Sequence, residues 1–215
     1  MKLAVLSESD ADEAAVRIFV EALLGQKTEA VSLSPPIRTR GWPAVAHVLP
    51  SVVKKLHYHT DAEALVLVVD SNSDPVHVPQ HDQPSCADQR CRLCRLRSLL
   101  TNTRRELRSV PGRAALKIAV GLAVPQIEAW YLCGQHPHVT EAAWMQGLES
   151  GKRPYTGSWL KQAVSGHDRP SLEEETRLAT EYAARLASNL ASLQQVFPNG
   201  FGALADGVKG WQPAP

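Results

Sequence analysis

The sequence predicts an α/β protein in which a mainly parallel sheet is flanked by helices and followed by a helical C-terminal region. Three observations predict this class. Short apolar segments rich in β-branched residues recur along the chain, segments with a helical period separate them, and polar turn residues bound both kinds. Strands and helices in alternation are the order expected of a parallel sheet with helices on its faces.

The chain is predicted to open with a buried strand and an amphipathic helix. Lys2–Leu6 is a short apolar segment that a polar cluster ends. Glu13–Leu24 then places apolar side chains at helical spacing, and Gly25 ends the helix. We expect Asp10 or Asp12 to be its N-cap.

The next region is expected to be mainly loop before the central strand. Residues 28–50, which contain Pro35, Pro36 and Pro43, are predicted to be mainly loop around a candidate strand, Ala30–Leu33, and a short helix is predicted at Val45–His57. Ala64–Val69 follows with six apolar residues and ends at Asp70. Such a continuous apolar run is typical of a central strand buried on both faces.

The later elements alternate in the same way. Cys91–Arg108 is predicted to be a basic helix, Leu116–Leu122 a strand, and Ile127–Cys133 a helix or turn. The alanine- and leucine-rich segment Leu172–Val196 and the short segment Phe201–Trp211 are predicted to be helices.

The domain organisation follows from these elements. Residues 1–135 are expected to form the α/β core, with a Cys/His/Arg-rich insertion at about 75–113, and residues 136–215 a helical region packed on the same domain. Ser171 followed by Glu174 is a capping-box pattern in that region.

The composition is that of a globular protein. Apolar residues make up 44% of the 215 residues and charged residues 21%. No run approaches the roughly 18 apolar residues that span a bilayer, and the N-terminus lacks a signal-peptide pattern, so a cytoplasmic protein without membrane contact is expected. In that compartment the four cysteines are expected to be thiols or metal ligands.

The charge distribution is uneven. Residues 90–117 contain nine Lys or Arg against one Glu, a local charge of +8 in a chain whose net charge is +1. Such a block favours an anionic partner such as DNA or RNA, although a solvated helix face gives the same pattern. The candidate nucleic-acid-binding residues are Arg90, Arg92, Arg95, Arg97, Arg104 and Arg105.

Acids follow the predicted strands. Glu8 comes after the first strand, Asp70 and Asp74 after the central strand, and Glu128 soon after the third. The carboxyl ends of parallel strands share one edge of the sheet, where functional groups gather. Clustered carboxylates repel one another unless a cation neutralises them, and oxygen ligands favour Mg²⁺ or Mn²⁺. The alternative is that each Asp is a turn former or helix cap.

Three segments resemble Toprim domains. Leu6–Glu13 resembles their opening motif, E-G-x-[ST]-[DE]-E, and Val68–Asp74 resembles their D-x-D motif. Pro125–Trp130 resembles the E-A-W stretch of the DUF4276 group of small Toprim-like proteins, which continues into a helical region comparable with Phe197–Trp211. The resemblance implies a Toprim-like, Rossmann-like fold.

The resemblance also implies roles for the strand-end acids. Glu8 would be the general acid/base of phosphoryl transfer, Asp70 and Asp74 would hold Mg²⁺, and Glu128 would complete or orient the metal site. The accessory acids of the first motif would be Asp12 and Glu13.

Two positions depart from the family pattern. Ser9 stands where the first motif has Gly, which questions the close backbone approach that Gly allows. Asn72 stands where D-x-D has its second acid and would be a neutral ligand, so Asp74 would have to substitute for that acid.

The insertion carries a second set of candidate ligands. His77, His81 and three cysteines lie within 18 residues. Zinc takes four tetrahedral N/S ligands, and His81 with Cys86, Cys91 and Cys94 would supply them as a structural site. The alternative is free thiols beside arginines.

These features predict a Mg²⁺-dependent phosphoryl-transfer enzyme, expected to be a nuclease acting on DNA or RNA. One alternative is a catalytically silent Toprim-like module that partners an ABC-type ATPase in a bacterial defence system, as the resemblance implies. A second alternative is a zinc-stabilised nucleic-acid-binding protein. The sequence contains no P-loop, no G-x-G-x-x-G and no G-x-S-x-G motif.

Overall fold

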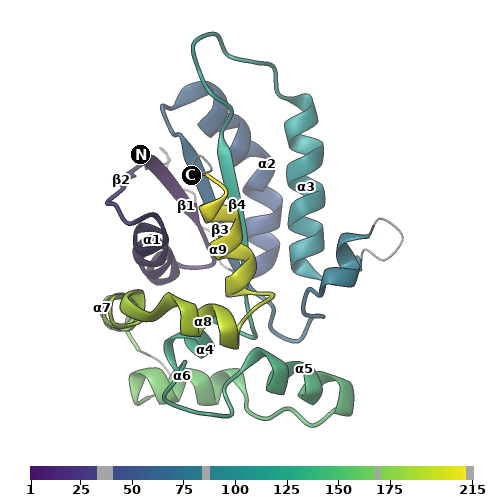
Figure 1. The fold of residues 1–215 in the computed structure, drawn as a ribbon, viewed down its shortest axis with the longest axis vertical. Helices are drawn as coiled ribbons and strands as arrows, with labels where there is room; N and C mark the ends of the chain where they lie inside the picture. Colours follow the sequence, from purple (N-terminus) through teal and green to yellow (C-terminus); the bar gives the residue numbers. More distant parts are fainter. Residues whose placement is uncertain (33–40, 84–87, 168–169, 212–215) are drawn as a thin grey trace.

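The computed structural model describes residues 1–32, 41–83, 88–167 and 170–211. Within these ranges it is an α/β fold with a four-stranded, all-parallel sheet in the order β2-β1-β3-β4 (Figure 1). The strands are β1 (Lys2–Leu6), β2 (Glu29–Ala30), β3 (Ala64–Asp70) and β4 (Lys117–Ala123). The predicted fold class, a Rossmann-like parallel sheet with a helical C-terminal region, is confirmed.

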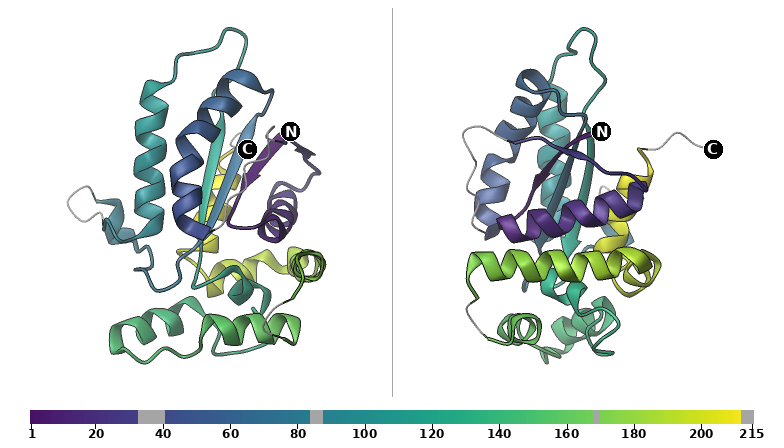
Figure 2. Two further views of the ribbon diagram at one scale, coloured as in Figure 1. Left: turned by 180° about the vertical axis from the view of Figure 1, so that it is seen from behind. Right: turned by 90° about the vertical axis from the view of Figure 1, so that its left-hand side faces the viewer.

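Helices cover both faces of the sheet (Figure 2). The helices α1 (Asp10–Leu24) and α9 (Phe201–Lys209) cover one face, and α2 (Gly41–His59) and α3 (Arg92–Glu106) cover the other. A further group gathers beyond the carboxyl edge of the sheet: α4 (Ile127–Tyr131), α5 (Glu141–Ser150), α6 (Gly157–Ser165), α7 (Leu172–Leu186) and α8 (Leu190–Val196). Short 3₁₀ turns lie at Pro79–Asp82 and Ala187–Asn189. Of the helices that the structure describes, none is long and apolar enough to cross a membrane.

Strand β3 is the centre of the core. Residues 64–69 are at most 1% exposed, because helices pack on both faces of the sheet and strands lie on both sides. Parallel sheets need this double coverage, and it requires the continuous apolar run that the sequence shows. The pairing brings Leu6 of β1 beside Leu67 of β3, so both strands end at the same edge.

Two predictions near the N-terminus are wrong in detail. Helix α1 begins at Asp10, and its N-cap is Ser9, whose hydroxyl accepts the backbone N–H of Asp12 at 3.2 Å. Neither Asp10 nor Asp12 is therefore the cap. Helix α1 ends at Gly25 as predicted, and Gly25 has a φ of +66°, in the left-handed region.

The helix predicted at Val45–His57 is confirmed, but α2 is longer than predicted and begins at Gly41, in the region expected to be loop. Pro43 lies in the first turn of α2, where proline is tolerated, while Pro50 lies inside the helix. The helix nevertheless continues, because Leu49 and the other apolar side chains of its inner face are fully buried. Strand β2 is shorter than predicted, and residue 33 of its expected range lies outside the described residues.

The C-terminal helices were only partly delimited by the sequence pattern. The segment predicted as one helix at Leu172–Val196 is α7 and α8, separated by a 3₁₀ turn, and its predicted cap is present because Ser171 Oγ accepts the Glu174 N–H at 3.2 Å. The spacing of apolar residues predicted a helical region there but did not predict α5 and α6 as separate helices.

Glycines allow the last helix to approach the sheet closely. A Cβ on Gly200, just before α9, would lie 2.2 Å from the Leu122 carbonyl oxygen of β4. A Cβ on Gly121 of β4 would lie 2.9 Å from the Leu204 Cβ of α9. Both contacts are too short for a side chain, so this helix–strand packing depends on glycine.

We expect Gly200→Ala to lower the free energy of unfolding by about 2 kcal/mol or more, since the new Cβ must displace strand backbone. Gly210→Ala is the matched control, because a Cβ there meets its nearest atoms at 3.5 Å. Thermal or urea unfolding measures the stability of both variants against that of the wild-type protein. Equal stabilities of the two variants would contradict the packing described.

Candidate functional site

A cavity of about 290 Å³ opens at the carboxyl edge of the sheet. The chain runs from β1 outward to β2 on one side and returns to β3 and β4 on the other, so the neighbouring ends of β1 and β3 form the switch point where α/β proteins bind ligands. Five acids line this acidic cavity: Glu8, Asp12, Asp70, Glu128 and Glu175.

Hydrogen bonds join Glu8 to two other elements. Its Oε1 accepts the backbone N–H of Asp70 at 2.9 Å, which ties the end of β1 to the end of β3. The backbone of Trp42, at the start of α2, also hydrogen-bonds to the Glu8 carboxylate. The carboxylate is therefore held between three segments that are distant in the sequence.

Two other acids of the cavity, Asp70 and Glu128, are positioned by contacts with α4 and α6. Asp70 Oδ1 accepts the Ile127 N–H at 3.1 Å, which fixes the start of α4 to β3. Helix α4 then presents Glu128 to the cavity, where Lys161 Nζ of α6 lies 3.8 Å from its Oε1. The cavity thus lies between the sheet edge and the C-terminal helices.

Burial raises the pKa of four acids in the cavity, and repulsion from neighbouring acids adds to the shift for Asp12, Asp70 and Glu128. Burial, then the charges of Glu128, Asp12 and Glu8, hold the pKa of Asp70 well above its usual value. Burial and the charge of Glu128 raise the pKa of Asp12 to about 7. Burial also raises the pKa of Glu128 and of Glu8, against an opposing effect of Arg92 on Glu8.

The carboxylates of this cavity are not tightly clustered. No three of its carboxylates bring oxygen atoms within 4.8 Å of one another, so a bound ion would be held by few of them and would keep water ligands. Mg²⁺ binds in that way, through one or two carboxylates and several waters. Tyr131 also lines the cavity, and its buried hydroxyl has no hydrogen-bond partner, which leaves a donor for a water or substrate oxygen.

The structure brings together most of the predicted metal-site residues. Glu8, Asp70, Asn72 and Glu128 line the acidic cavity, as does the accessory Asp12. The structure places Asp74 and Glu13 elsewhere. Asp74 Oδ2 accepts a hydrogen bond from Arg92 Nε at 2.6 Å, and Glu13 Oε1 accepts the Ser7 N–H at 3.4 Å.

The two departures from the family motif have local structural causes. Ser9 caps α1, which a glycine would do without a side-chain acceptor. Asn72 adopts φ +50° in the left-handed region, which Asn tolerates better than most residues, and its Oδ1 accepts a hydrogen bond from Gln126 Nε2 at 3.2 Å. Both residues therefore have a structural role in the fold.

Several arginines of the basic block form ion pairs with nearby acids. Arg90 pairs with Asp88, Arg92 with Asp74, and Arg97 with Asp82. The guanidinium of Arg95 lies 5.1 Å from the centre of the Trp42 ring. The arginines predicted to bind nucleic acid that remain exposed at the far end of α3 are Arg104 and Arg105.

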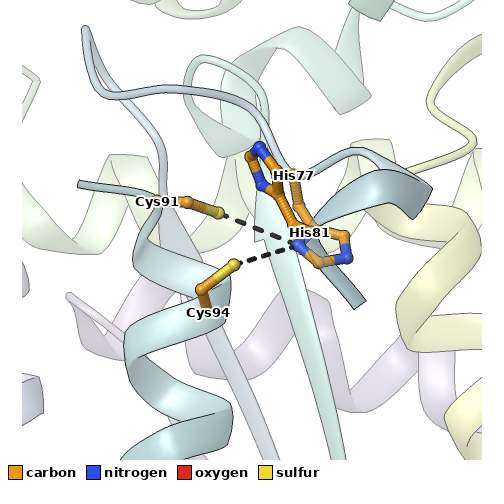
Figure 3. Close-up of side chains that lie close together, drawn as sticks. All are labelled: His77, His81, Cys91 and Cys94. Carbon is orange, nitrogen blue, oxygen red and sulfur yellow. Dashed lines mark hydrogen bonds between the residues drawn. The ribbon is translucent and has the colours of Figure 1, made fainter. Parts of the chain in front are cut away.

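A second site lies at the start of α3 (Figure 3). The His/Cys cluster comprises His77, His81, Cys91 and Cys94, whose candidate ligand atoms all lie within 4.8 Å of one another. His77 Nδ1 is 3.4 Å from Cys94 Sγ and 3.8 Å from Cys91 Sγ. This cluster can hold a metal ion. The predicted ligand Cys86 lies outside the described residues, and the structure supplies His77, which the predicted set omitted.

The surroundings of the cluster suit a bound cation. The buried Nδ1 of His81 has no hydrogen-bond partner. The other nitrogen of His77, Nε2, lies 3.2 Å from Asp82 Oδ1, the arrangement in which a carboxylate orients a metal-bound histidine. Burial raises the pKa of the Cys91 thiol to about 12, so metal binding there would release a proton.

The sequence pattern missed three residues of the acidic cavity. Tyr131 follows Glu128 by three residues and shares its helix face, which helical spacing could have shown. Lys161 and Glu175 come from α6 and α7 and reach the cavity only through tertiary packing. No local pattern marks them.

The raised pKa values predict the pH dependence of metal-free stability. Asp12 holds its proton more tightly in the folded chain than in the unfolded chain, so its contribution to the free energy of unfolding falls as pH rises from about 4 to about 7. Asp12→Asn is therefore expected to stabilise the metal-free protein at pH 8 by an amount on the order of 2 kcal/mol.

Urea unfolding at pH 5 and pH 8, with a chelator present, measures this effect. Asp10→Asn is the control, because Asp10 lies two residues away on the exposed side of α1. A destabilising effect of Asp12→Asn at pH 8 would contradict the electrostatics described.

Comparisons of the chain with protein-family models, with curated proteins and with solved structures found no match. The resemblance to Toprim-like proteins and to the DUF4276 group therefore stays a prediction, and the function proposed below is inferred from the geometry of the two sites.

Proposed function

We propose that the protein is a Mg²⁺-dependent phosphoryl-transfer enzyme whose active site is the acidic cavity. One observation carries this proposal: acids from the ends of β1 and β3, from α1 and from α4 line a single cavity at the switch point of the sheet. Such a group of buried acids is costly without a cation.

The residues of the cavity suit hydrolysis of a phosphate ester. A bound Mg²⁺ or Mn²⁺ supplies charge stabilisation at the phosphate and lowers the pKa of a bound water. Asp70 and Glu128 are placed to hold the ion, while Glu8, whose pKa burial raises, is suited to accept a proton from the attacking water. Lys161, at the rim, offers a positive charge to the phosphate.

Nucleic acid is the substrate class that we propose. Arg104 and Arg105 are exposed on the basic helix α3, where they can contact a phosphate backbone. Arg90, Arg92 and Arg97 are paired with acids, so a small phosphodiester, which needs no basic surface, is the first substrate for testing the chemistry.

Glu8→Gln and Asp70→Asn are expected to lower Mn²⁺-dependent hydrolysis of bis(p-nitrophenyl) phosphate, DNA or RNA at least a hundredfold, because each removes a charged group of the cavity. Asp10→Asn is the control acid outside the cavity. Hydrolysis is followed by absorbance for the small substrate and by gel for nucleic acid.

Equal activity of the Glu8 and Asp70 variants and the wild-type protein would contradict the proposed active site. Mn²⁺ binding to the cavity without hydrolysis of any of the three substrates would instead favour the catalytically silent module that partners an ABC-type ATPase.

We also propose that the metal of the His/Cys cluster is zinc with a structural role. Two histidine nitrogens and two thiolates are a common structural zinc set, and tetrahedral bonds of about 2.0–2.3 Å place ligands about 3.3–3.8 Å apart. The distances of 3.4 and 3.8 Å from His77 Nδ1 to the two sulfurs agree with that spacing.

Purified protein is expected to contain about one zinc per chain by elemental analysis, and Cys94→Ser or His81→Ala should lose most of it. Cys133→Ser is the matched control, since Cys133 is a buried free cysteine outside the cluster. Protein expressed with added zinc that contains none would contradict this assignment.

A further inference from the structure

A second cavity, of about 480 Å³, lies at the amino edge of the sheet. Its walls come from the second half of α2, the end of α3 and the loop between α3 and β4. Figure 1 shows that loop at the end of the molecule opposite to α4–α8, so the two cavities lie at opposite ends of the sheet. We call it the basic pocket, because Arg104, Arg108 and Arg113 line it and, of the residues that the structure describes, no acid does.

Backbone carbonyl groups hold two of the three guanidinium groups. Arg113 donates to three carbonyl oxygens around the end of α2, at distances of 2.7–3.4 Å. Arg104 Nη2 donates to the Leu116 carbonyl oxygen at 3.3 Å. A carbonyl group orients a guanidinium without neutralising it, and a guanidinium has further N–H groups to donate. Both arginines therefore keep a positive charge and donors for a ligand.

The positive charge of the basic pocket is not balanced by ion pairs. Within the described ranges, none of its three arginines forms a salt bridge, and the exposed side chain of Arg108 has no hydrogen-bond partner. Asp61, the acid that acts electrostatically on one of these arginines, is paired with Lys2. Glu106, at the end of α3, is paired with Lys54. The pocket is therefore suited to an anion that the protein itself does not supply.

Apolar side chains also line the basic pocket. They are Val53, Leu107, Val110, Leu116 and Ile118. A concave site with a mainly apolar lining and a few convergent polar groups is typical of small-molecule binding. The phosphate backbone of a nucleic acid has no apolar part that could cover these side chains, so the lining favours a small ligand.

From these observations we infer that the basic pocket binds a small phosphate ester whose organic part is apolar or aromatic. The phosphate would lie among the three arginines, whose N–H forks match its oxygens, and the organic part would pack on the apolar lining. Three positive charges favour a phosphate dianion over a carboxylate, which carries one negative charge. The inference goes beyond the proposed function, because the basic pocket shares no residue with the acidic cavity.

Isothermal titration calorimetry on the full chain, in buffer without Mg²⁺ or Mn²⁺, tests this inference. The probes are phenyl phosphate, inorganic phosphate and benzoate. Phenyl phosphate should bind roughly tenfold or more tightly than inorganic phosphate, because its ring leaves water for the apolar lining. It should also bind roughly tenfold or more tightly than benzoate, because a dianion makes stronger charge-assisted hydrogen bonds to the arginines.

Arg108→Gln is the most direct variant, because the Arg108 side chain has no described hydrogen bond or ion pair that the fold would lose. It is expected to weaken the binding of phenyl phosphate about tenfold. Arg105→Gln is the matched control, since Arg105 is an exposed arginine of the same helix that does not line the pocket. It should keep the wild-type affinity within about twofold at physiological salt, where exposed charges are screened.

Ser109 offers a second pair of variants, because it is exposed and lines the basic pocket. Ser109→Glu places a carboxylate beside the arginines and should abolish the binding of phenyl phosphate. Ser109→Gln has a side chain of the same size without the charge and should retain binding. Far-UV circular dichroism checks that both variants are folded.

Absence of phenyl phosphate binding at millimolar concentrations would overturn the inference, as would equal affinities of Arg108→Gln and the wild-type protein. Arg104 is also one of the arginines proposed to contact nucleic acid, so a single-stranded oligonucleotide is titrated as well. Oligonucleotide binding without phenyl phosphate binding would assign these arginines to nucleic acid and overturn the inference. None of these titrations depends on hydrolysis in the acidic cavity, so their failure leaves the proposed function intact.

Discussion

The hydrogen bond from the Asp70 N–H to Glu8 Oε1 joins the two strand ends on which the rest of the site depends. It forms at the switch point, where β1 and β3 are neighbours but their connections leave in opposite directions. Because the strands diverge from a shared edge there, side chains at their carboxyl ends face an opening that no strand fills. The bond fixes Glu8 at that opening, and Asp70 then fixes the start of α4 through the Ile127 N–H.

The remaining features follow from the burial of acids beside this bond. The C-terminal helices cover the sheet edge and turn it into a cavity, which raises the pKa values of Asp12, Asp70 and Glu128. Two cations offset part of this charge: Lys161 lies near Glu128, and Arg92 lies near Glu8. Neither ion pair is tight: the N–O distances are 3.8 Å for Lys161–Glu128 and 3.6 Å for Arg92–Glu8.

The sequence predicted the parts of the molecule that local patterns determine. A doubly buried parallel strand must be continuously apolar, which made Ala64–Val69 clear, and strand-end placement located Glu8, Asp70 and Glu128. The helix predicted at Val45–His57 is present, but its start was placed too late, because Pro43 suggested loop although proline is tolerated in the first turn of a helix.

Tertiary partners could not be predicted in this way. Proximity in the sequence suggested Asp74 as a metal ligand. In the structure its carboxylate instead accepts a hydrogen bond from Arg92, eighteen residues further along the chain. The same limit applies to His77, whose place beside Cys91 and Cys94 depends on how the insertion folds back on α3. Charge counting likewise suggested a free basic surface, but Arg90, Arg92 and Arg97 of that block are paired with acids.

Anomalous diffraction from crystals soaked in Mn²⁺ tests the central claim most directly. The account predicts a manganese peak in the acidic cavity between the Asp70 and Glu128 carboxylates, with oxygen ligands at about 2.1–2.2 Å and waters completing the coordination. A zinc-edge peak at the His/Cys cluster would be separate from it. Crystals in which manganese is absent from the cavity at saturating Mn²⁺, with both carboxylates ordered, would contradict the account.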